Sequence, residues 1–188
     1  MKISNLFWLG WLVLGANPVV GQHFIPDSAI NNLKLGDYKN TERIFGAVWD
    51  KKSFEADGLL PRLEIVNRDS TQVLRLMVEY GGVKDAANQF EILAVNKHYK
   101  FPRKLLRMNV DTFKTSRKIT LFLPKDSVIR ILGRNYKASG GKEGNEELFF
   151  EIDDSNHFVK RYNEWKYFIE CTFRNGVLVD YSFGFEDV

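Results

Sequence analysis

The pattern of apolar and polar positions along the chain predicts short amphipathic helices and alternating strands. The clearest helical segment is residues 119–133, ITLFLPKDSVIRILG, in which an extended lead-in precedes a short helix. Pro124 suits the first helical turn, which needs no backbone donor there, and Gly133 suits the end, because glycine adopts the left-handed conformation at little cost. Val128, Ile131 and Leu132 form one apolar stripe. Residues 33–46 repeat this arrangement in a weaker form.

Alternation of apolar and polar residues predicts six strands, three after each helical segment. These strands span residues 62–66, 72–80, 89–95, 147–153, 166–173 and 177–185. Asn175-Gly176, between the last two, is a strong signal for a two-residue hairpin turn. Residues 28–32 are expected to start a short helix, whereas residues 49–60 and 135–145 are expected to form loops.

The two groups of elements align with one another. Residues 63–65 (LEI) lie 87 positions before residues 150–152 (FEI), and Gly46 lies 87 positions before Gly133. We therefore predict an α+β fold of two tandem repeats, each a helical segment followed by three strands. The repeats are expected to form one antiparallel sheet with the helices on one face.

The N-terminus predicts export. Lys2 precedes an apolar run at residues 6–14, and small residues follow, which is typical of a cleaved secretory signal peptide at residues 1–21. The mature protein is then expected to be periplasmic or extracellular, with no transmembrane segment after cleavage. We assign the first repeat to 22–96, a basic connector to 97–118 and the second repeat to 119–188.

Composition narrows the function classes only slightly. The formal net charge is +3, and no nucleic-acid-binding motif occurs, so nucleic acid is not an expected partner. The basic residues at 97–117 would suit an anionic partner, but they show no clear period, so a solvated linker is favoured. Cys171 is the only cysteine, so no disulfide can form within the chain. Its alternation with Ile169 and Phe173 favours a buried residue over a nucleophile.

Alternation also assigns the two faces of the predicted sheet. The helix-facing positions are Leu63, Ile65, Leu74, Leu76, Val78, Tyr80, Phe90, Ile92, Ala94, Leu148, Phe150, Ile152, Tyr167, Ile169, Cys171, Phe173, Val177, Val179, Tyr181, Phe183 and Phe185. The opposite face mixes charges with apolar residues, and an uncovered face should be mostly polar. Its apolar members include Val73, Met77, Leu93, Phe149 and Phe168.

An exposed apolar patch marks a partner site. The candidate binding residues on the open face are therefore Arg75, Met77, Leu93, Phe149 and Phe168, and Met77 and the two phenylalanines are expected to be exposed.

Candidate chemistry is sparse. The three histidines show no metal-ligand spacing, and we predict neither a metal site nor a cofactor. Asp153, Asp154 and Asn156 are oxygen-rich, but a plain turn is favoured over a calcium site. Glu151 and Glu170, on adjacent predicted strands, could be imagined as a general acid and base. Neighbouring Lys and Arg residues favour solvated surface charge, so we expect no catalytic residues.

The repeat resembles a known fold family. Leu35-Gly36, Phe45-Gly46 and Leu132-Gly133, together with the strand triplets, are similar to the β-lactamase-inhibitor-protein-like fold, which includes small outer-membrane lipoproteins of the SmpA/OmlA type. Phe122 departs from the pattern, since it stands where the first copy has Gly36. The resemblance implies a binding module that uses its open sheet face and adjoining loops.

These observations lead to one functional expectation with two alternatives. We expect an exported, non-catalytic binding module whose partner is a protein or an envelope component. A structural or assembly factor of the cell envelope is the nearest alternative, and a hydrolase with a carboxylate site is a further one.

Overall fold

The computed structural model describes residues 24–46, 55–56, 61–78, 86–101, 106–140 and 144–186. The predicted signal peptide, Tyr80 and most of the predicted loop at 49–60 lie outside these described residues. No helix in the described ranges is long and apolar enough to cross a membrane.

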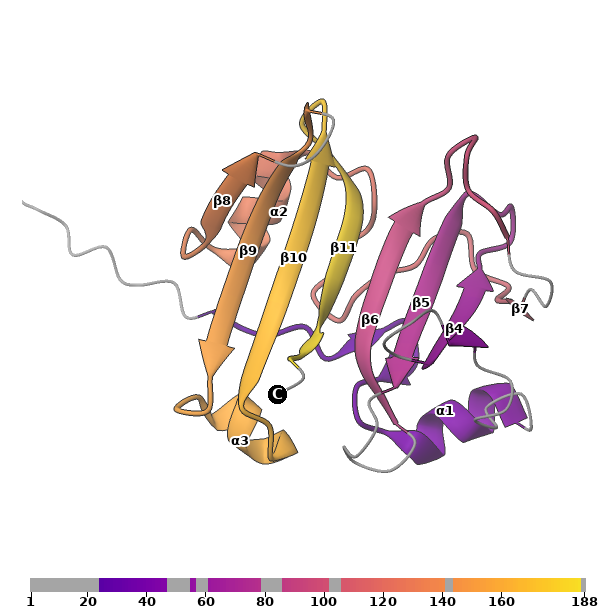
Figure 1. The fold of residues 1–188 in the computed structure, drawn as a ribbon, viewed down its shortest axis with the longest axis horizontal. Helices are drawn as coiled ribbons and strands as arrows, with labels where there is room; N and C mark the ends of the chain where they lie inside the picture. The colour runs from indigo at the N-terminus through magenta and orange to yellow at the C-terminus, as the bar shows by residue number, and fades with distance from the viewer. Residues whose placement is uncertain are drawn as a thin grey trace, which may run out of the picture.

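One mixed sheet organises the fold, and the class is α+β, as predicted (Figure 1). Its strands lie in the order β3 (Glu55–Ala56), β4 (Pro61–Val66), β5 (Gln72–Val78), β6 (Ala87–Ala94), β11 (Val177–Phe185), β10 (Lys166–Arg174), β9 (Glu146–Asp153) and β8 (Lys137–Gly140). Each neighbouring pair in this order is antiparallel, whereas the short strand β7 (Leu106–Arg107) pairs with β4 in parallel. The six predicted strands are all present.

Three short helices follow local capping signals. The helix α1 (Tyr38–Phe45) begins where the Asp37 carboxylate accepts a hydrogen bond from the Asn40 amide at 3.0 Å. The helix α2 (Lys125–Leu132) begins after Pro124 and ends at Gly133, whose φ is +95°, as predicted. The six-residue helix α3 (His157–Tyr162) was not predicted, because it is shorter than the two helical turns that a pattern needs.

Alternation assigned the core face of the sheet almost completely. The helix-facing positions of β4, β5, β9 and β10 lie in one hydrophobic core with residues of all three helices. Val177 and Val179 are corrections, because both are half-buried while Leu178 is fully buried. A register shift between Thr172 and Phe173 pairs Phe173 with Leu178, and a β-bulge of this kind moves a side chain to the other face. Ile152 and Ala94 are only half-buried.

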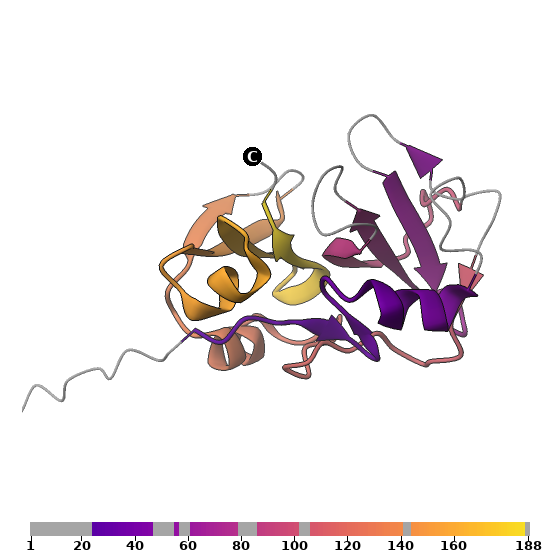
Figure 2. The ribbon, with the colours of Figure 1, turned by 90° about the horizontal axis from the view of Figure 1, so that it is seen from below.

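The N-terminal lead is held under the sheet by a buried carboxylate. Asp27 is fully buried and accepts hydrogen bonds from the hydroxyl groups of Tyr181 and Ser116 and from the Arg117 amide. Tyr167 donates its hydroxyl to the Asp27 carbonyl at 2.8 Å. Burial, and then the charge of Asp27, raise the pKa of Tyr181 well above its usual value. Figure 2 shows this lead and α2 on the same side of the strands.

Three local predictions are wrong. Residues 28–32 form part of a hairpin of β1 (Ala29–Ile30) and β2 (Leu33–Lys34), in which Asn31 has a φ of +50°, rather than a helix. The predicted loop at 135–145 contains β8, all four residues of which are exposed and therefore show no alternation. The predicted basic linker contains β7.

The lead-in to α2 is only partly extended, because Leu121 and Phe122 form a turn in which Phe122 has a φ of +68°. The Phe122 amide donates to the Leu178 carbonyl at 2.8 Å, and the Leu178 amide donates to the Leu123 carbonyl at 3.0 Å. The first part of β11 therefore pairs with this segment, and β6 pairs with Asp180 to Gly184 of the same strand. Gly184 is required there, because a Cβ atom would lie 2.4 Å from the Asn88 carbonyl oxygen.

Candidate binding face

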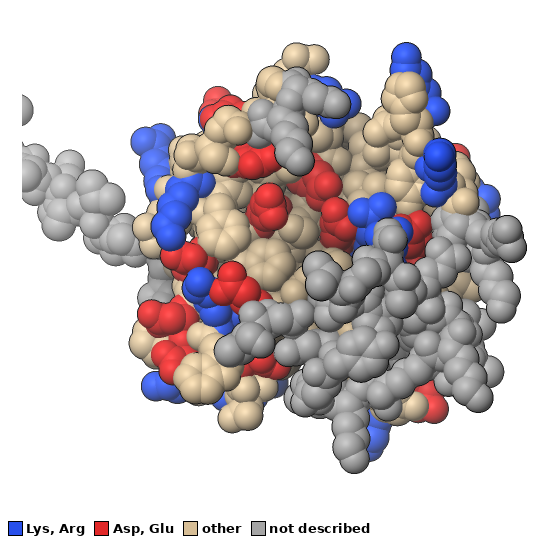
Figure 3. All heavy atoms as spheres, viewed as in Figure 1, with Lys and Arg blue, Asp and Glu red and all other residues tan. Residues whose placement is uncertain are grey.

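The sheet face opposite the helices is called the open face here, and Figure 3 shows it. Residues that face one another across paired strands lie on the same side of a sheet. The strand register therefore places one row across the open face, in the order Glu64, Arg75, Glu91, Ser182, Glu170 and Phe149. The next row contains Val66, Val73, Leu93, Asp180, Thr172 and Glu147.

In the first half of the sheet, β4 to β6, the charges of this row are paired. The guanidinium of Arg75 lies between two carboxylates, 2.8 Å from Glu64 and 3.0 Å from Glu91. The Tyr99 hydroxyl donates to the second oxygen of Glu64 at 2.5 Å, and its ring centroid lies 5.9 Å from the Arg75 guanidinium. These four residues are called the ionic ladder.

The pKa values of Arg75 and Tyr99 are shifted in the directions that this pairing favours. Burial opposes the positive charge of Arg75, but the two neighbouring carboxylates outweigh it, and the pKa of Arg75 is raised. Burial, and then the hydrogen bond to Glu64, raise the pKa of Tyr99 to about 12. Arg75 therefore keeps its charge and Tyr99 its phenolic proton throughout the physiological pH range.

Tyr99 also covers part of the open face. Val66, Val73 and Leu93 form a small second hydrophobic cluster, and Val95 and Tyr99 pack against it. The expectation that Val73 and Leu93 belong to an open apolar patch is therefore wrong, since they are 0% and 9% exposed. The segment after β6 folds back over this corner of the sheet, which alternation within the strands did not reveal.

Where the two halves of the sheet meet, four carboxyl groups gather, and only Glu91 among them has a cationic partner, Arg75. Glu91, Glu147, Glu170 and Asp180 are called the acidic patch, and Figure 3 shows acidic side chains near the middle of the face beside aromatic rings. Among the described residues, neither Glu170 nor Asp180 forms an ion pair, whereas Glu91 shares Arg75 with Glu64.

Mutual repulsion and burial perturb the acidic patch. Burial raises the pKa of Asp180 to about 8, with further contributions from the charge of Glu91 and a hydrogen bond to it, and Arg75 opposes the change. Burial and then the charges of Glu147 and Glu91 raise the pKa of Glu170. At neutral pH, Asp180 is therefore largely protonated, and the patch favours any positive charge brought to it.

Phe149 and Phe168 form a stacked pair next to the acidic patch. Their ring centroids lie 6.3 Å apart with an interplanar angle of 12°. Both rings are half-buried, as is Met77, so the expected exposure is only partial. Glu151 beside them is neutralised by Lys137 at 2.5 Å and by Lys166 at 3.6 Å.

The five predicted binding residues form two groups rather than one. Phe149 and Phe168 lie together in the second half of the sheet, whereas Arg75, Met77 and Leu93 lie on β5 and β6. Glu151 and Glu170, imagined as an acid–base pair but expected to be surface charges, have different neighbours. Glu151 pairs with lysines, and the closest electrostatic neighbours of Glu170 are Glu147 and Glu91.

Alternation places Glu91 and Asp180 on the open face, but sequence reasoning missed that they meet there and missed Tyr99. Asp180 and Glu91 come together because β11 pairs with β6. Tyr99 reaches Glu64 from the segment after β6. The alternation of Asp180 between two apolar residues was a signal for its face, but nothing in the sequence identified its neighbouring strand.

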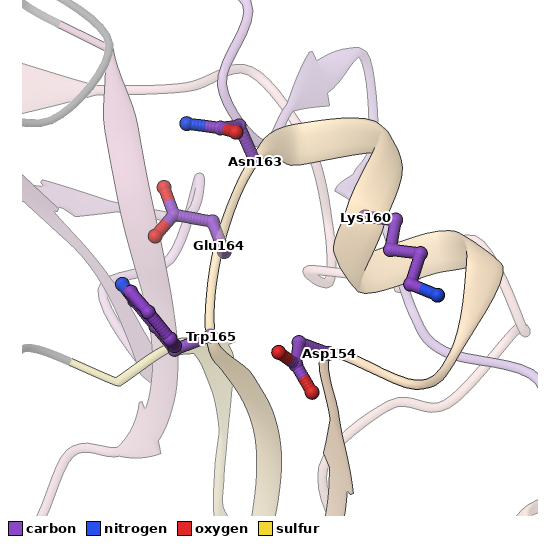
Figure 4. A pocket seen from close by; sticks show the side chains of 5 residues that line it. All are labelled: Asp154, Lys160, Asn163, Glu164 and Trp165. Carbon is purple, nitrogen blue, oxygen red and sulfur yellow. The ribbon is translucent and has the colours of Figure 1, made fainter.

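A shallow hollow of about 250 Å³ lies just before the start of β10 (Figure 4). Trp165, 66% exposed, lines it with Asp154, Lys160, Asn163 and Glu164, and Asp154 lies between Lys160 and Trp165. The adjoining turn is structural, because Asp153 accepts hydrogen bonds from Ser155 and Asn156 caps α3. No group of three potential metal ligands occurs in the described part of the chain.

No protein-family model, characterised protein or solved structure matches this chain.

Proposed function

We propose that this protein is an exported, non-catalytic binding module whose open face docks a basic segment of a partner protein. The observation that carries this proposal is that Glu170 and Asp180 have no ion pair among the described residues and lie beside the partly exposed Phe149–Phe168 pair. The carboxyl groups attract a positive charge, to which Asp180 can release its proton, and the rings supply apolar contact at the centre of an interface.

A protein segment fits this face better than a small molecule. Small-molecule sites are enclosed and mostly apolar, whereas this part of the sheet presents charged side chains beside the half-buried Phe149 and Phe168. The open face presents side chains from four adjacent strands, β6, β11, β10 and β9, in two rows. Such a surface suits an extended chain or a loop with several positive residues.

The proposal also includes export by a signal peptide and an origin of the fold in two copies of one unit. The apolar run and small residues within 1–21 support a cleaved signal peptide. Two copies of one unit are supported by the strand order, in which β3 to β6 on one side mirrors β8 to β11 on the other. Gly36 and Phe122 occupy corresponding positions and both have a φ of +68°. The resemblance to the β-lactamase-inhibitor-protein-like fold agrees with a binding role.

Two alternatives make different predictions. An envelope assembly factor would bind an outer-membrane component rather than a soluble partner. A carboxylate hydrolase is favoured by one observation, the raised pKa of Asp180 next to Glu91. Such an enzyme would lose a measurable hydrolytic activity in the variant Asp180→Asn, whereas a binding module would have no such activity to lose.

The test is affinity capture from the native envelope fraction with the full-length chain expressed in its own host. The variants Phe168→Glu and Glu170→Lys change the open face, and Lys39→Glu changes an exposed charge on α1 as the matched control. We expect one partner with a basic segment that cross-links to the open face and is released by about 0.5 M salt. Both face variants should lose it and the control should retain it. Equal capture by all variants would reject the proposal.

A further inference from the structure

The row across the open face contains the same arrangement twice, once with a cation and once without. In the first half, Arg75 on β5 lies between Glu64 on β4 and Glu91 on β6. In the second half, Ser182 on β11 lies between Glu91 on β6 and Glu170 on β10. Each pair of carboxylates is separated by two strand spacings, roughly 10 Å between backbones. The position over Ser182, between Glu91 and Glu170, is called the serine notch.

The surroundings of the serine notch match those of Arg75. An aromatic ring lies beside Arg75, since Tyr99 is 5.9 Å from its guanidinium. Phe149 follows Glu170 in the same row, and it stacks on Phe168. Arg75 contacts Oε2 of Glu91, and Glu91 also forms a hydrogen bond with Asp180 in the next row.

We infer that an arginine of the docked segment places its guanidinium in the serine notch, between Glu91 and Glu170, as Arg75 lies between Glu64 and Glu91. This inference rests on the proposed function, and it names the side chain that the open face recognises. The short hydroxymethyl group of Ser182 leaves the position between the carboxylates to the partner, whereas a long residue there would fill it.

Geometry favours arginine over lysine. A guanidinium is a planar fork with five donors, so it can contact carboxylates on two sides at once and also stack on a neighbouring ring. An ammonium is a compact charge that is more strongly hydrated, and it gains less from an aromatic neighbour. The protein already uses this preference, because Arg75 contacts two carboxylates through different nitrogens.

The electrostatics of the acidic patch supports this assignment. Burial and then the charges of Glu147 and Glu91 raise the pKa of Glu170, and burial and then the charge of Glu91 raise that of Asp180. A guanidinium among these groups would relieve the repulsion and favour their charged forms. Arginine docking is therefore expected to release a proton from the patch near neutral pH.

The experiment is calorimetric titration of the full chain with octa-arginine and with octa-lysine, peptides of equal length and charge. We expect octa-arginine to bind about tenfold more tightly at equal salt. The variant Ser182→Arg should place a guanidinium of the chain itself in the serine notch and weaken octa-arginine binding about tenfold or more. Glu151→Gln, which removes a paired carboxylate of the same face, should change binding less than about twofold.

A second variant keeps the test decisive if Ser182→Arg fails to fold. Glu170→Gln changes an exposed side chain by one charge, so it should fold, and it should abolish most of the preference for arginine over lysine. Equal affinity for the two peptides, or unchanged binding by both Ser182→Arg and Glu170→Gln, would overturn the inference.

The native partner separates this inference from the proposed function. If Phe168→Glu loses the captured partner while Ser182→Arg retains it, the open face binds but the serine notch is not used. If both variants retain the partner, the proposed function itself fails. Loss of the partner in both variants, with retention in Glu151→Gln, supports the two proposals together.

Discussion

The two halves of the sheet carry similar side chains on the open face but leave them in different states. In the first half, Glu64 is 8% exposed and its two oxygens are engaged by Arg75 and Tyr99. In the second half, Glu170 is exposed, and its electrostatic neighbours Glu147 and Glu91 are also acidic. The carboxylates of the first half are thus paired within the chain itself. The second half would be stabilised by a positive charge from a partner.

This difference teaches that residue type alone does not identify a binding surface. A carboxylate with a cationic neighbour contributes to stability, and a carboxylate among others opposes it. Removing a charge should therefore have opposite effects in the two halves, which makes the comparison testable by unfolding experiments in the absence of any partner.

The largest effect is expected when the ionic ladder loses its cation. In Arg75→Met, Glu64 would keep only Arg62 at 3.5 Å and Glu91 would lose its cation, and breaking these partly buried pairs should lower the free energy of unfolding by about 2 kcal/mol. Urea unfolding measures this. The double variant Glu64→Gln, Arg75→Met should recover part of the loss. A change below about 1 kcal/mol would mean that the ionic ladder stabilises the protein no more than a surface ion pair does.

A smaller loss is expected for Tyr99→Phe. This variant keeps the ring over Val66, Val73 and Leu93 but removes the hydrogen bond to Glu64. A bond to a charged, partly buried acceptor is worth about 1.5 kcal/mol, measured as a fall in the free energy of unfolding. Tyr136→Phe is the control, since no hydrogen bond of its hydroxyl is found among the described residues. Equal effects of the two variants would show that the phenol does not stabilise Glu64.

The pH dependence of stability should depend on Asp180. Its pKa is about 8 in the folded protein, against an ordinary value of 3.8. Between these values the folded state holds a proton that the unfolded state has released, so the free energy of unfolding should fall as the pH rises from about 5 to 8. Asp180→Asn should flatten this fall and be most stabilising near pH 9. An unchanged slope would show that Asp180 ionises normally.

The smallest effect is expected for Glu170→Gln, and its sign is opposite to that of the first two. Removing one of several neighbouring negative charges should raise the free energy of unfolding by about 0.3 kcal/mol, since the site is exposed and screened by solvent. The gain should vanish at high salt. Glu64→Gln is the matched variant in the first half and should destabilise instead. The comparison fails if both variants shift stability in the same direction.

The sequence by itself determined the local elements and the core face. Pro124 and Gly133 marked α2, Asn175-Gly176 marked the turn before β11, and alternation selected nearly every strand residue of the main core. These features depend on backbone geometry and on a period of two or 3.6 residues, which neighbouring residues in the chain reveal. The short helix α3, the exposed strand β8 and the bulge beside Leu178 had no such periodic signal.

Only the tertiary structure decided which charges meet on the open face. Glu91 and Asp180 lie 89 positions apart in the chain, and they meet because the last strands of the two halves pair with each other. Tyr99 reaches Glu64 because the segment after β6 folds back over the sheet. Pairing partners and chain reversals are set by the packing of the whole domain, and electrostatic interaction depends on distance in space. The acidic patch therefore became visible only once the strands were in register.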